Sequence, residues 1–186
     1  MTTYQPYLDF TAQSKAMNTL HVLYTRLLMP EGTYHGDLLL AMVVFTAFAI
    51  EGYLNSLGSR TIPYWDDLER LPWKQKVSIL HKHHGATPLW GKDPLQFAKE
   101  IFELRDKLAH GKPEKVKGPV FATTDEAHAY HQKRLLEPEW YQKITVDWMH
   151  KSKSRFDDLV AYLGDVCGMP KGDPEIEAFY GVLTDD

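Results

Sequence analysis

An arginine and a histidine near the end of one predicted helix have side chains that could act together on a phosphate ester. Arg105 lies five positions before His110, and Gly111 follows the histidine directly. Imidazole changes charge near neutral pH, so a histidine can serve as a general acid or base. An arginine can hold a phosphate and stabilise the extra charge of a five-coordinate phosphorus. Because RNA carries its own nucleophile, the 2′-hydroxyl, such a pair could cleave RNA without a metal.

The position of Arg105 on its helix indicates an anionic partner. On a helical wheel of residues 95–110, Arg105 lies in the middle of the apolar arc, where a solvated side chain is not expected. The partner could be Glu51 or the phosphate of a ligand. Glu51 and Asn55 share the apolar stripe of an earlier helix, and a carboxylate buried there needs a cation or several donors. Alternatively, that helix reaches the surface after Ile50 and Glu51 is solvated.

The sequence around the arginine and histidine resembles a known motif. Residues 102–111 read FELRDKLAHG, with an aliphatic residue before the arginine, a polar one after it, and Gly after the histidine. This resembles the HEPN superfamily, whose motif is Arg, a polar residue, three to five further residues, then His. Asp106 stands where the family frequently has Asn. Residues 47–55 (AFAIEGYLN) and 73–77 (WKQKV) resemble the preceding family helices, so the resemblance covers roughly residues 35–112.

The resemblance implies an all-α fold, a HEPN-like bundle of about five to six helices with an up-and-down core. It also implies a homodimer in which two motifs face each other across a cleft. Many members are metal-independent endoribonucleases of the toxin, defence or RNA-processing classes. Carried over, Arg105 and His110 are catalytic and Asp106 orients or tunes them, with RNA as substrate and an antitoxin or another protein as a further partner. Other members are non-catalytic nucleotide-binding or protein-interaction modules, and a third possibility is a scaffold in which Arg105 only pairs with Glu51.

The charge distribution favours a nucleic-acid surface near the motif. The whole chain has a net charge of −4, yet residues 74–117 hold ten Lys or Arg and five Asp or Glu, which gives +5 there and −9 elsewhere. Lysines beside the motif are therefore candidate phosphate contacts: Lys107, Lys112, Lys115 and Lys117. The alternative is an ordinary solvated loop.

Other residue clusters predict less chemistry. His81 and His84 share one helix face, as do His128 and His131, but no four-ligand zinc set is visible, so we expect no metal and no cofactor. The three histidines at 81, 83 and 84 instead indicate a basic or pH-sensitive surface. Trp73 and Trp90 could stack on bases, but core packing is the more common role of aromatic residues in helical proteins.

Apolar spacing is helical nearly everywhere and places the motif at the end of one helix. We expect a helix from Leu8 to Met29, stopped by Pro30, and one from Asp37 to just before Gly58. A third covers Trp73 to His84. The fourth opens with Asp93 as cap and Pro94 in the first position, and ends at His110. After a loop from Gly111 to Ala122, a capping box from Thr123 to Glu126 begins a helix that reaches Leu136, and the last helix runs from beyond Pro138 to Cys167.

Length and composition fit one globular domain over residues 1–186, with a core at about 8–167 and a less ordered tail at 171–186, in which Phe179 and Tyr180 could dock. The single Cys167 excludes a disulfide framework. Met1 to Phe10 lacks a signal-peptide pattern, and the 13-residue apolar run from Leu38 to Ile50 is shorter than the roughly 18 residues that cross a bilayer. We expect a cytoplasmic protein with no membrane segment.

Overall fold

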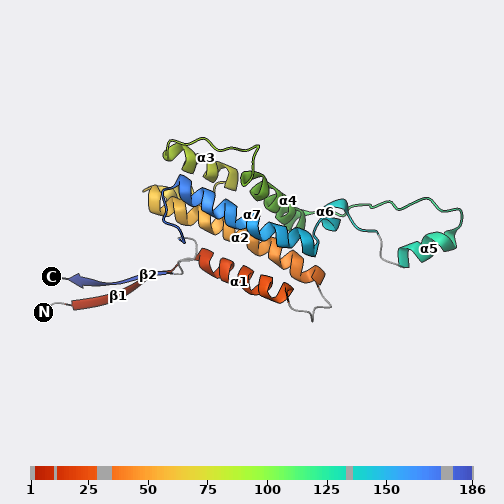
Figure 1. Ribbon diagram of the computed structural model, residues 1–186, viewed down its shortest axis with the longest axis horizontal. Coiled ribbons are helices and arrows are strands. Elements are labelled where there is room, and N and C mark those ends of the chain that lie inside the picture. Colours follow the sequence, from red (N-terminus) through yellow and green to blue (C-terminus); the bar gives the residue numbers. More distant parts are fainter. Residues whose placement is uncertain (1–2, 11, 29–34, 133–135, 173–177, 186) are drawn as a thin grey trace.

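The chain folds into an α-helical bundle from which two extensions project (Figure 1). The structure is a computed structural model that describes residues 3–10, 12–28, 35–132, 136–172 and 178–185. The predicted all-α helical class is confirmed. In order, the elements are β1 (Thr3–Phe10), α1 (Ala12–Leu27), α2 (His35–Thr61), a 3₁₀ helix η1 (Trp65–Asp67), α3 (Trp73–His83), α4 (Leu95–His110), α5 (Thr124–Gln132), α6 (Glu139–Gln142), α7 (Val146–Val166) and β2 (Ala178–Asp185).

Helix α2 forms the centre of the bundle because it is apolar on almost every side. It packs against α1, α3, α4 and α7, and Met42, Val43, Ala49 and Leu54 are fully buried. By length and composition alone, Gly36–Thr61 could cross a membrane, since its best window has a mean hydropathy of 1.8. Half of that window is buried inside the bundle, which is the environment of a core helix.

One stripe of α2 stays partly uncovered. The Phe48 side chain is 51% exposed and its ring meets the ring of Phe45 edge to face, with centroids 6.1 Å apart. Val44 beside them is half-buried. Within the part of the chain that the structure describes, this stripe is an apolar surface beside the core rather than a part of it.

Two predicted helix boundaries differ from the structure for identifiable reasons. Helix α2 does not end before Gly58 but continues to Thr61. A Cβ atom at Gly58 would collide with the ring of Trp65, so the glycine provides space for η1 rather than a helix stop. At the start of α4, Asp93 does not cap the helix, because its carboxylate accepts a hydrogen bond from Arg155 on α7 at 2.8 Å. The predicted ends at Gly85 and Gly168 agree with their left-handed backbone, at φ of 69° and 70°.

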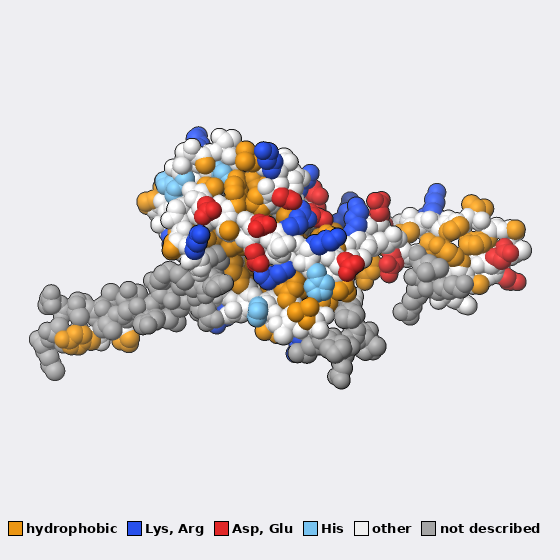
Figure 2. Space-filling model, in the orientation of Figure 1, with side chains coloured by type: hydrophobic (Ala, Val, Ile, Leu, Met, Phe, Trp, Pro, Cys, Tyr) orange, Lys and Arg blue, Asp and Glu red, His pale blue; other side chains and the backbone are white. Residues whose placement is uncertain are grey.

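Residues 111–132 and 136–138 form an arm that projects from the bundle (Figures 1 and 2). Gly111 to Val120 is exposed throughout, and α5 has no buried residue. The capping box predicted from the sequence is present, because Thr123 N donates to Glu126 Oε2 and Glu126 N donates to Thr123 Oγ1, both at 3.3 Å. The rings of Phe121 and Tyr130 contact each other within the arm, at 5.3 Å between centroids. The arm is therefore held by its own contacts, and both of its ends join the bundle beside α4.

The second extension is a two-stranded antiparallel ribbon of β1 and β2, with Thr3 opposite Asp185 and Phe10 opposite Ala178. Figure 1 shows it pointing away from the bundle with both chain termini at its far end. The helix predicted from Leu8 is therefore wrong at its start, and α1 begins at Ala12. The tail predicted to be less ordered contains β2, while Pro30 and residues 133–135 and 173–177 lie outside the described residues. The helix predicted to reach Leu136 is described only to Gln132, and Leu136 itself is not helical. β1 and β2 pair although almost the whole chain separates them, so no local sequence pattern predicts this ribbon.

The buried ring of His81 joins α3 to α7. Its Nδ1 donates to the carbonyl oxygen of Val77 at 2.7 Å, and its Nε2 accepts from the hydroxyl of Tyr162 at 2.6 Å. Burial lowers the pKa of His81 below its ordinary value, against the effect of the Val77 carbonyl, and His84 nearby lowers it further. His81 is thus a hydrogen-bonded core residue, whereas His83 and His84 are exposed.

This histidine predicts a loss of stability in weak acid. Below pH 6.5 the unfolded chain binds a proton at His81 that the native protein resists, so the free energy of unfolding falls as pH drops until the native pKa is reached. We expect urea unfolding at pH 5.5 to give a lower free energy of unfolding than at pH 7.5. His84, whose pKa is lowered by its own partial burial and by His83, adds in the same direction. A His81→Gln variant with an unchanged pH dependence would contradict this assignment.

Candidate functional site

The last three turns of α4 and the two ends of the arm line a groove of about 680 Å³. Asp106, Lys107 and His110 lie on one face of α4, since positions three and four apart share a helix side. The arm leaves along one side of the groove and returns along the other through α6. The complete lining is Glu100, Glu103, Leu104, Asp106, Lys107, His110, Gly111, Lys112, Pro113, Glu114, Trp140 and Lys143.

Gly111 lets the chain turn sharply at the rim of the groove. Its φ of −60° is open to any residue, but a Cβ atom there would collide with the carbonyl oxygen of Lys107. The glycine therefore allows the backbone to close over the end of α4. This turn places Lys112 beside His110 in the same groove.

The groove contains four carboxylates, and each of them already has a cationic partner. Glu100 accepts from Arg155 at 2.7 Å and from the indole of Trp148 at 3.0 Å. The other three pairs are Glu103 with Lys99 at 3.7 Å, Asp106 with Arg105 at 3.2 Å and Glu114 with Lys107 at 2.8 Å. The acidic groups are thus neutralised locally, which lowers the electrostatic cost of bringing an anion into the groove.

Two cationic or titratable groups of the groove have no such partner. Among the residues that the structure describes, the side chains of His110 and Lys112 form no ion pair or hydrogen bond, and both are exposed. Lys143 pairs only with Glu139, at 3.7 Å on the surface. His110 and Lys112 are therefore the groups that an incoming phosphate would meet first.

Arg105 does not line this groove. Its guanidinium lies over the ring of Phe102, 5.4 Å from the centroid, and its Nε is 3.2 Å from Asp106 Oδ1 without the alignment of a hydrogen bond. The side chain is 29% exposed. Five helical positions separate Arg105 from His110 by about 140° around α4 and about 7.5 Å along it. One chain therefore brings Asp106, Lys107, His110 and Lys112 together but leaves Arg105 on a neighbouring face.

Glu51 has a different partner from the one considered in the sequence. Its Oε1 accepts a hydrogen bond from Lys76 Nζ at 3.1 Å, and the Lys76 side chain is 1% exposed. The hypothesis that Arg105 pairs with Glu51 is thus wrong, because the cation comes from α3. Asn55 is half-buried near this pair on α2, and its Oδ1 has no hydrogen-bond partner in the described part of the chain. Glu51 belongs to the α2–α3 interface, and neither Glu51 nor Asn55 lines the groove.

The remaining predicted residues lie farther out. Lys115 and Lys117 lie beyond the groove, on the exposed segment by which the arm leaves α4. Within the described ranges they form no ion pair. Trp73 stacks on Phe102 with centroids 4.7 Å apart, and Trp90 meets Trp73 edge to face, so both are packing residues. Sequence reasoning missed Trp140 and Lys143, which reach the groove only because the arm returns to α4. Pro138, which interrupts the helical pattern just before Trp140, was the one sequence feature that pointed to a change of chain direction there.

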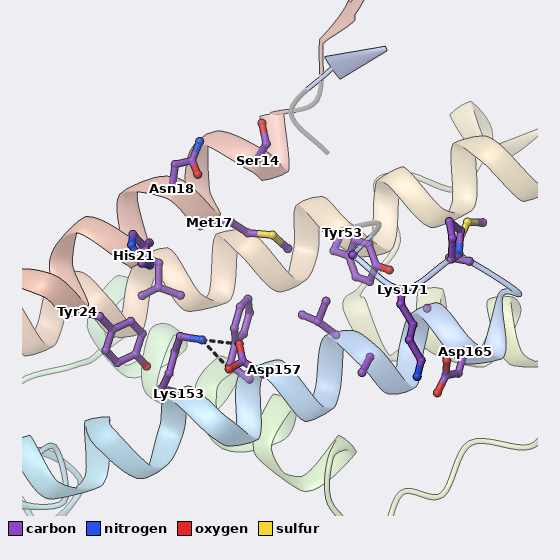
Figure 3. A pocket seen from close by; sticks show the side chains of 18 residues that line it. Ser14, Met17, Asn18, His21, Tyr24, Tyr53, Lys153, Asp157, Asp165 and Lys171 are labelled. Carbon is purple, nitrogen blue, oxygen red and sulfur yellow. Dashed lines mark hydrogen bonds and ion pairs between the residues drawn. The ribbon is translucent and has the colours of Figure 1, made fainter. Parts of the chain in front are cut away.

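A second hollow lies between α1 and α7, with α2 beneath it (Figure 3). Its volume is about 610 Å³, and it includes the apolar side chains of Met17, Leu20, Phe156 and Val160. Lys153 and Asp157 at its rim pair with each other at 2.7 Å. Burial, and secondarily the charge of Asp157, raises the pKa of Tyr24 in this hollow. Lys153 and Asp157 thus neutralise each other, and the exposed His21, Asp165 and Lys171 also line the hollow.

Among the described residues, no cluster of three or more His, Cys, Asp or Glu side chains could hold a metal ion. Comparison of the chain with protein-family models, with curated proteins and with solved structures finds no match.

Proposed function

We propose that the protein is a metal-independent endoribonuclease of the HEPN type that acts in the cytoplasm as a homodimer. The observation that carries the proposal is the groove at the end of α4, where His110 and Lys112 are unpaired while every neighbouring carboxylate is neutralised. A phosphodiester fits this pattern, because it brings one negative charge per nucleotide and needs exposed cations. Lys115 and Lys117 extend the basic path along the arm, whereas Lys107 on α4 is paired with Glu114.

The chemistry uses the substrate's own hydroxyl. His110 accepts the proton of a ribose 2′-hydroxyl while the oxygen attacks the adjacent phosphorus. The bond from phosphorus to the 5′-oxygen of the next nucleotide breaks, that oxygen takes a proton from water, and His110 then releases the proton it accepted to solvent. The products are a 2′,3′-cyclic phosphate and a free 5′-hydroxyl. Lys112 offsets the charge of the phosphate, and Arg105 stabilises the added charge on the five-coordinate phosphorus.

A second copy supplies what one chain lacks. Arg105 and His110 face different sides of α4 in one chain, so a phosphate held by His110 meets the arginine only if a partner motif approaches. The uncovered stripe of Val44, Phe45 and Phe48 on α2 is an apolar surface that a second copy would bury. Dimerisation would therefore complete the site.

The test of this function is RNA cleavage in excess EDTA by wild-type protein and by Arg105→Ala. We expect wild type to cut and the variant to be about 10²–10³-fold slower. Arg70→Ala is the matched control, since the Arg70 side chain is 95% exposed and distant in sequence from the motif. Light scattering on the same samples should give twice the chain mass of 21.4 kDa. A monomer, or cutting unaffected by Arg105→Ala, would contradict the composite site.

A non-catalytic nucleotide-binding or protein-interaction module is the second candidate. The specific observation in its favour is that Arg105 lies outside the groove and is held by Phe102 and Asp106. Such a module would bind RNA or a nucleotide through His110 and Lys112 without cutting it. Binding that is lost in Lys112→Ala, with no cleavage of any RNA by wild type, would favour this candidate.

A further inference from the structure

The hollow between α1 and α7 is a site that the proposed cleavage of RNA does not use. It shares no lining residue with the groove at the end of α4. Its volume of about 610 Å³ lies within the range of small-molecule sites, which often form between the helices of a bundle. The lining residues Ala161 and Asp165 are exposed, so the hollow reaches the protein surface and a ligand can enter it.

The hollow is elongated, because it follows the two helices that form its walls. Its lining runs from Ser14 to Tyr24 on α1 and from Lys153 to Asp165 on α7 (Figure 3). At 1.5 Å per helical residue, these stretches are about 15 Å and about 18 Å long. The walls meet near Tyr24, whose hydroxyl donates to the carbonyl oxygen of Met149 on α7 at 3.4 Å. This contact bounds the hollow at one end.

Apolar side chains line the middle of the hollow. Met17 and Leu20 come from α1, and Phe156 and Val160 come from α7, at spacings of three and four residues that share a helix face. An extended hydrocarbon chain advances about 1.3 Å per C–C bond, so about twelve carbons match the length of the hollow. Such a chain would remove its own apolar surface and that of both walls from water. The middle of the hollow therefore fits a single alkyl chain.

The four formal charges in the lining are arranged differently at the two ends. At the Tyr24 end, Lys153 donates to Asp157 at 2.7 Å, so these two charges cancel. At the other end, the side chains of Asp165 and Lys171 are exposed and form no ion pair or hydrogen bond within the described residues. Figure 3 shows both of them at this end of the hollow. An unpaired carboxylate beside an unpaired ammonium group is complementary to a ligand head that carries both charges.

We propose that the hollow between α1 and α7 binds a single-chain amphiphile with a zwitterionic headgroup, of the alkylphosphocholine class. The alkyl chain lies between the two helices with its end toward Tyr24. The quaternary ammonium group of the head faces Asp165, and the phosphate faces Lys171. Because the ligand contacts both walls of the folded bundle, its binding stabilises the native protein. The site is separate from the RNA groove and does not depend on the proposed ribonuclease function.

Isothermal titration calorimetry with dodecylphosphocholine, below the concentration at which it forms micelles, tests the proposal. Dodecanoate and dodecylamine present a chain of the same length with a single charge, and phosphocholine presents the head without the chain.

Two pairs of variants separate the chain site from the head site. Met17→Gln places an amide on the apolar wall, and Leu23→Gln is its control, because Leu23 is also half-buried on α1 but does not line the hollow. Asp165→Lys removes the carboxylate at the head. Its control is Asp158→Lys, since Asp158 is equally exposed on α7 and lies outside the lining. Thermal unfolding verifies that each variant is folded.

We expect one dodecylphosphocholine per chain, at least about threefold weaker binding of dodecanoate and dodecylamine, and no measurable binding of phosphocholine. Met17→Gln should weaken dodecylphosphocholine binding about tenfold, because the chain would bury an amide without a partner. Asp165→Lys should reverse the preference, so that dodecanoate binds more tightly than dodecylphosphocholine. Leu23→Gln and Asp158→Lys should bind as wild type does.

Three results would overturn the inference. They are the absence of binding by wild type, several equivalent sites per chain, and wild-type affinity in Met17→Gln. Equal affinity of wild type for the three dodecyl ligands, or an unchanged preference in Asp165→Lys, overturns the zwitterionic headgroup and with it the proposed ligand class. None of these outcomes bears on RNA cleavage, which is measured separately with Arg105→Ala.

Discussion

Glu51→Ala is expected to lower the free energy of unfolding by about 3 kcal/mol. The substitution removes the carboxylate that pairs with Lys76 at 3.1 Å and leaves an ammonium group buried on a side chain that is only 1% exposed. Unpairing a buried charge costs about 3–5 kcal/mol, and the lower end applies because Glu51 itself is 39% exposed. Urea unfolding at neutral pH measures the change.

Lys76→Met is the matched variant for this pair. Methionine fills a similar volume without a charge, and the partly exposed Glu51 can take its hydrogen bonds from water. We expect stability within about 1 kcal/mol of wild type, since replacing a buried ion with an apolar residue is often neutral. Equal losses of unfolding free energy in Glu51→Ala and Lys76→Met would contradict this, because they would show that the attraction within the pair, and not the burial of an unpaired lysine, determines the loss.

His110→Ala is expected to reduce RNA cleavage by about 10²–10⁴-fold, the usual contribution of a general acid or base. The stability of the bundle should stay unchanged, because the His110 side chain is exposed and forms no hydrogen bond within the described residues. His150→Ala on the exposed side of α7 is the control. RNA binding should fall far less than the rate, since Lys112 still contributes its charge.

The elements around the motif could largely be predicted from sequence because their signals are local. Apolar periodicity and Gly111 place the end of α4, and the capping box at Thr123 places α5. The anionic partner demanded by an arginine in an apolar arc was also a sound expectation. The expected identity of that partner was wrong, because Asp106, the next residue along the chain, supplies the carboxylate. The Phe102 ring packs against the same guanidinium.

The parts that sequence reasoning missed depend on contacts between distant segments. Asp93 is a residue type that often caps helices, but its carboxylate instead accepts a charge-assisted hydrogen bond from Arg155, which is stronger than a bond to a backbone N–H group. Glu51 meets Lys76 because α2 and α3 pack together, and no local pattern encodes that pairing. Trp140 enters the groove only after the arm has left the bundle and returned. The ribbon of β1 and β2 joins opposite ends of the chain.

The most direct measurement of the central claim is the chemistry of RNA ends after incubation with the protein in excess EDTA. We expect 2′,3′-cyclic phosphate and 5′-hydroxyl ends from wild type, no cleavage at a site whose ribose lacks the 2′-hydroxyl, and a loss of about 10²–10⁴-fold in rate for His110→Ala. Wild-type protein that leaves every RNA intact, or His110→Ala that cuts as fast as wild type, would contradict it.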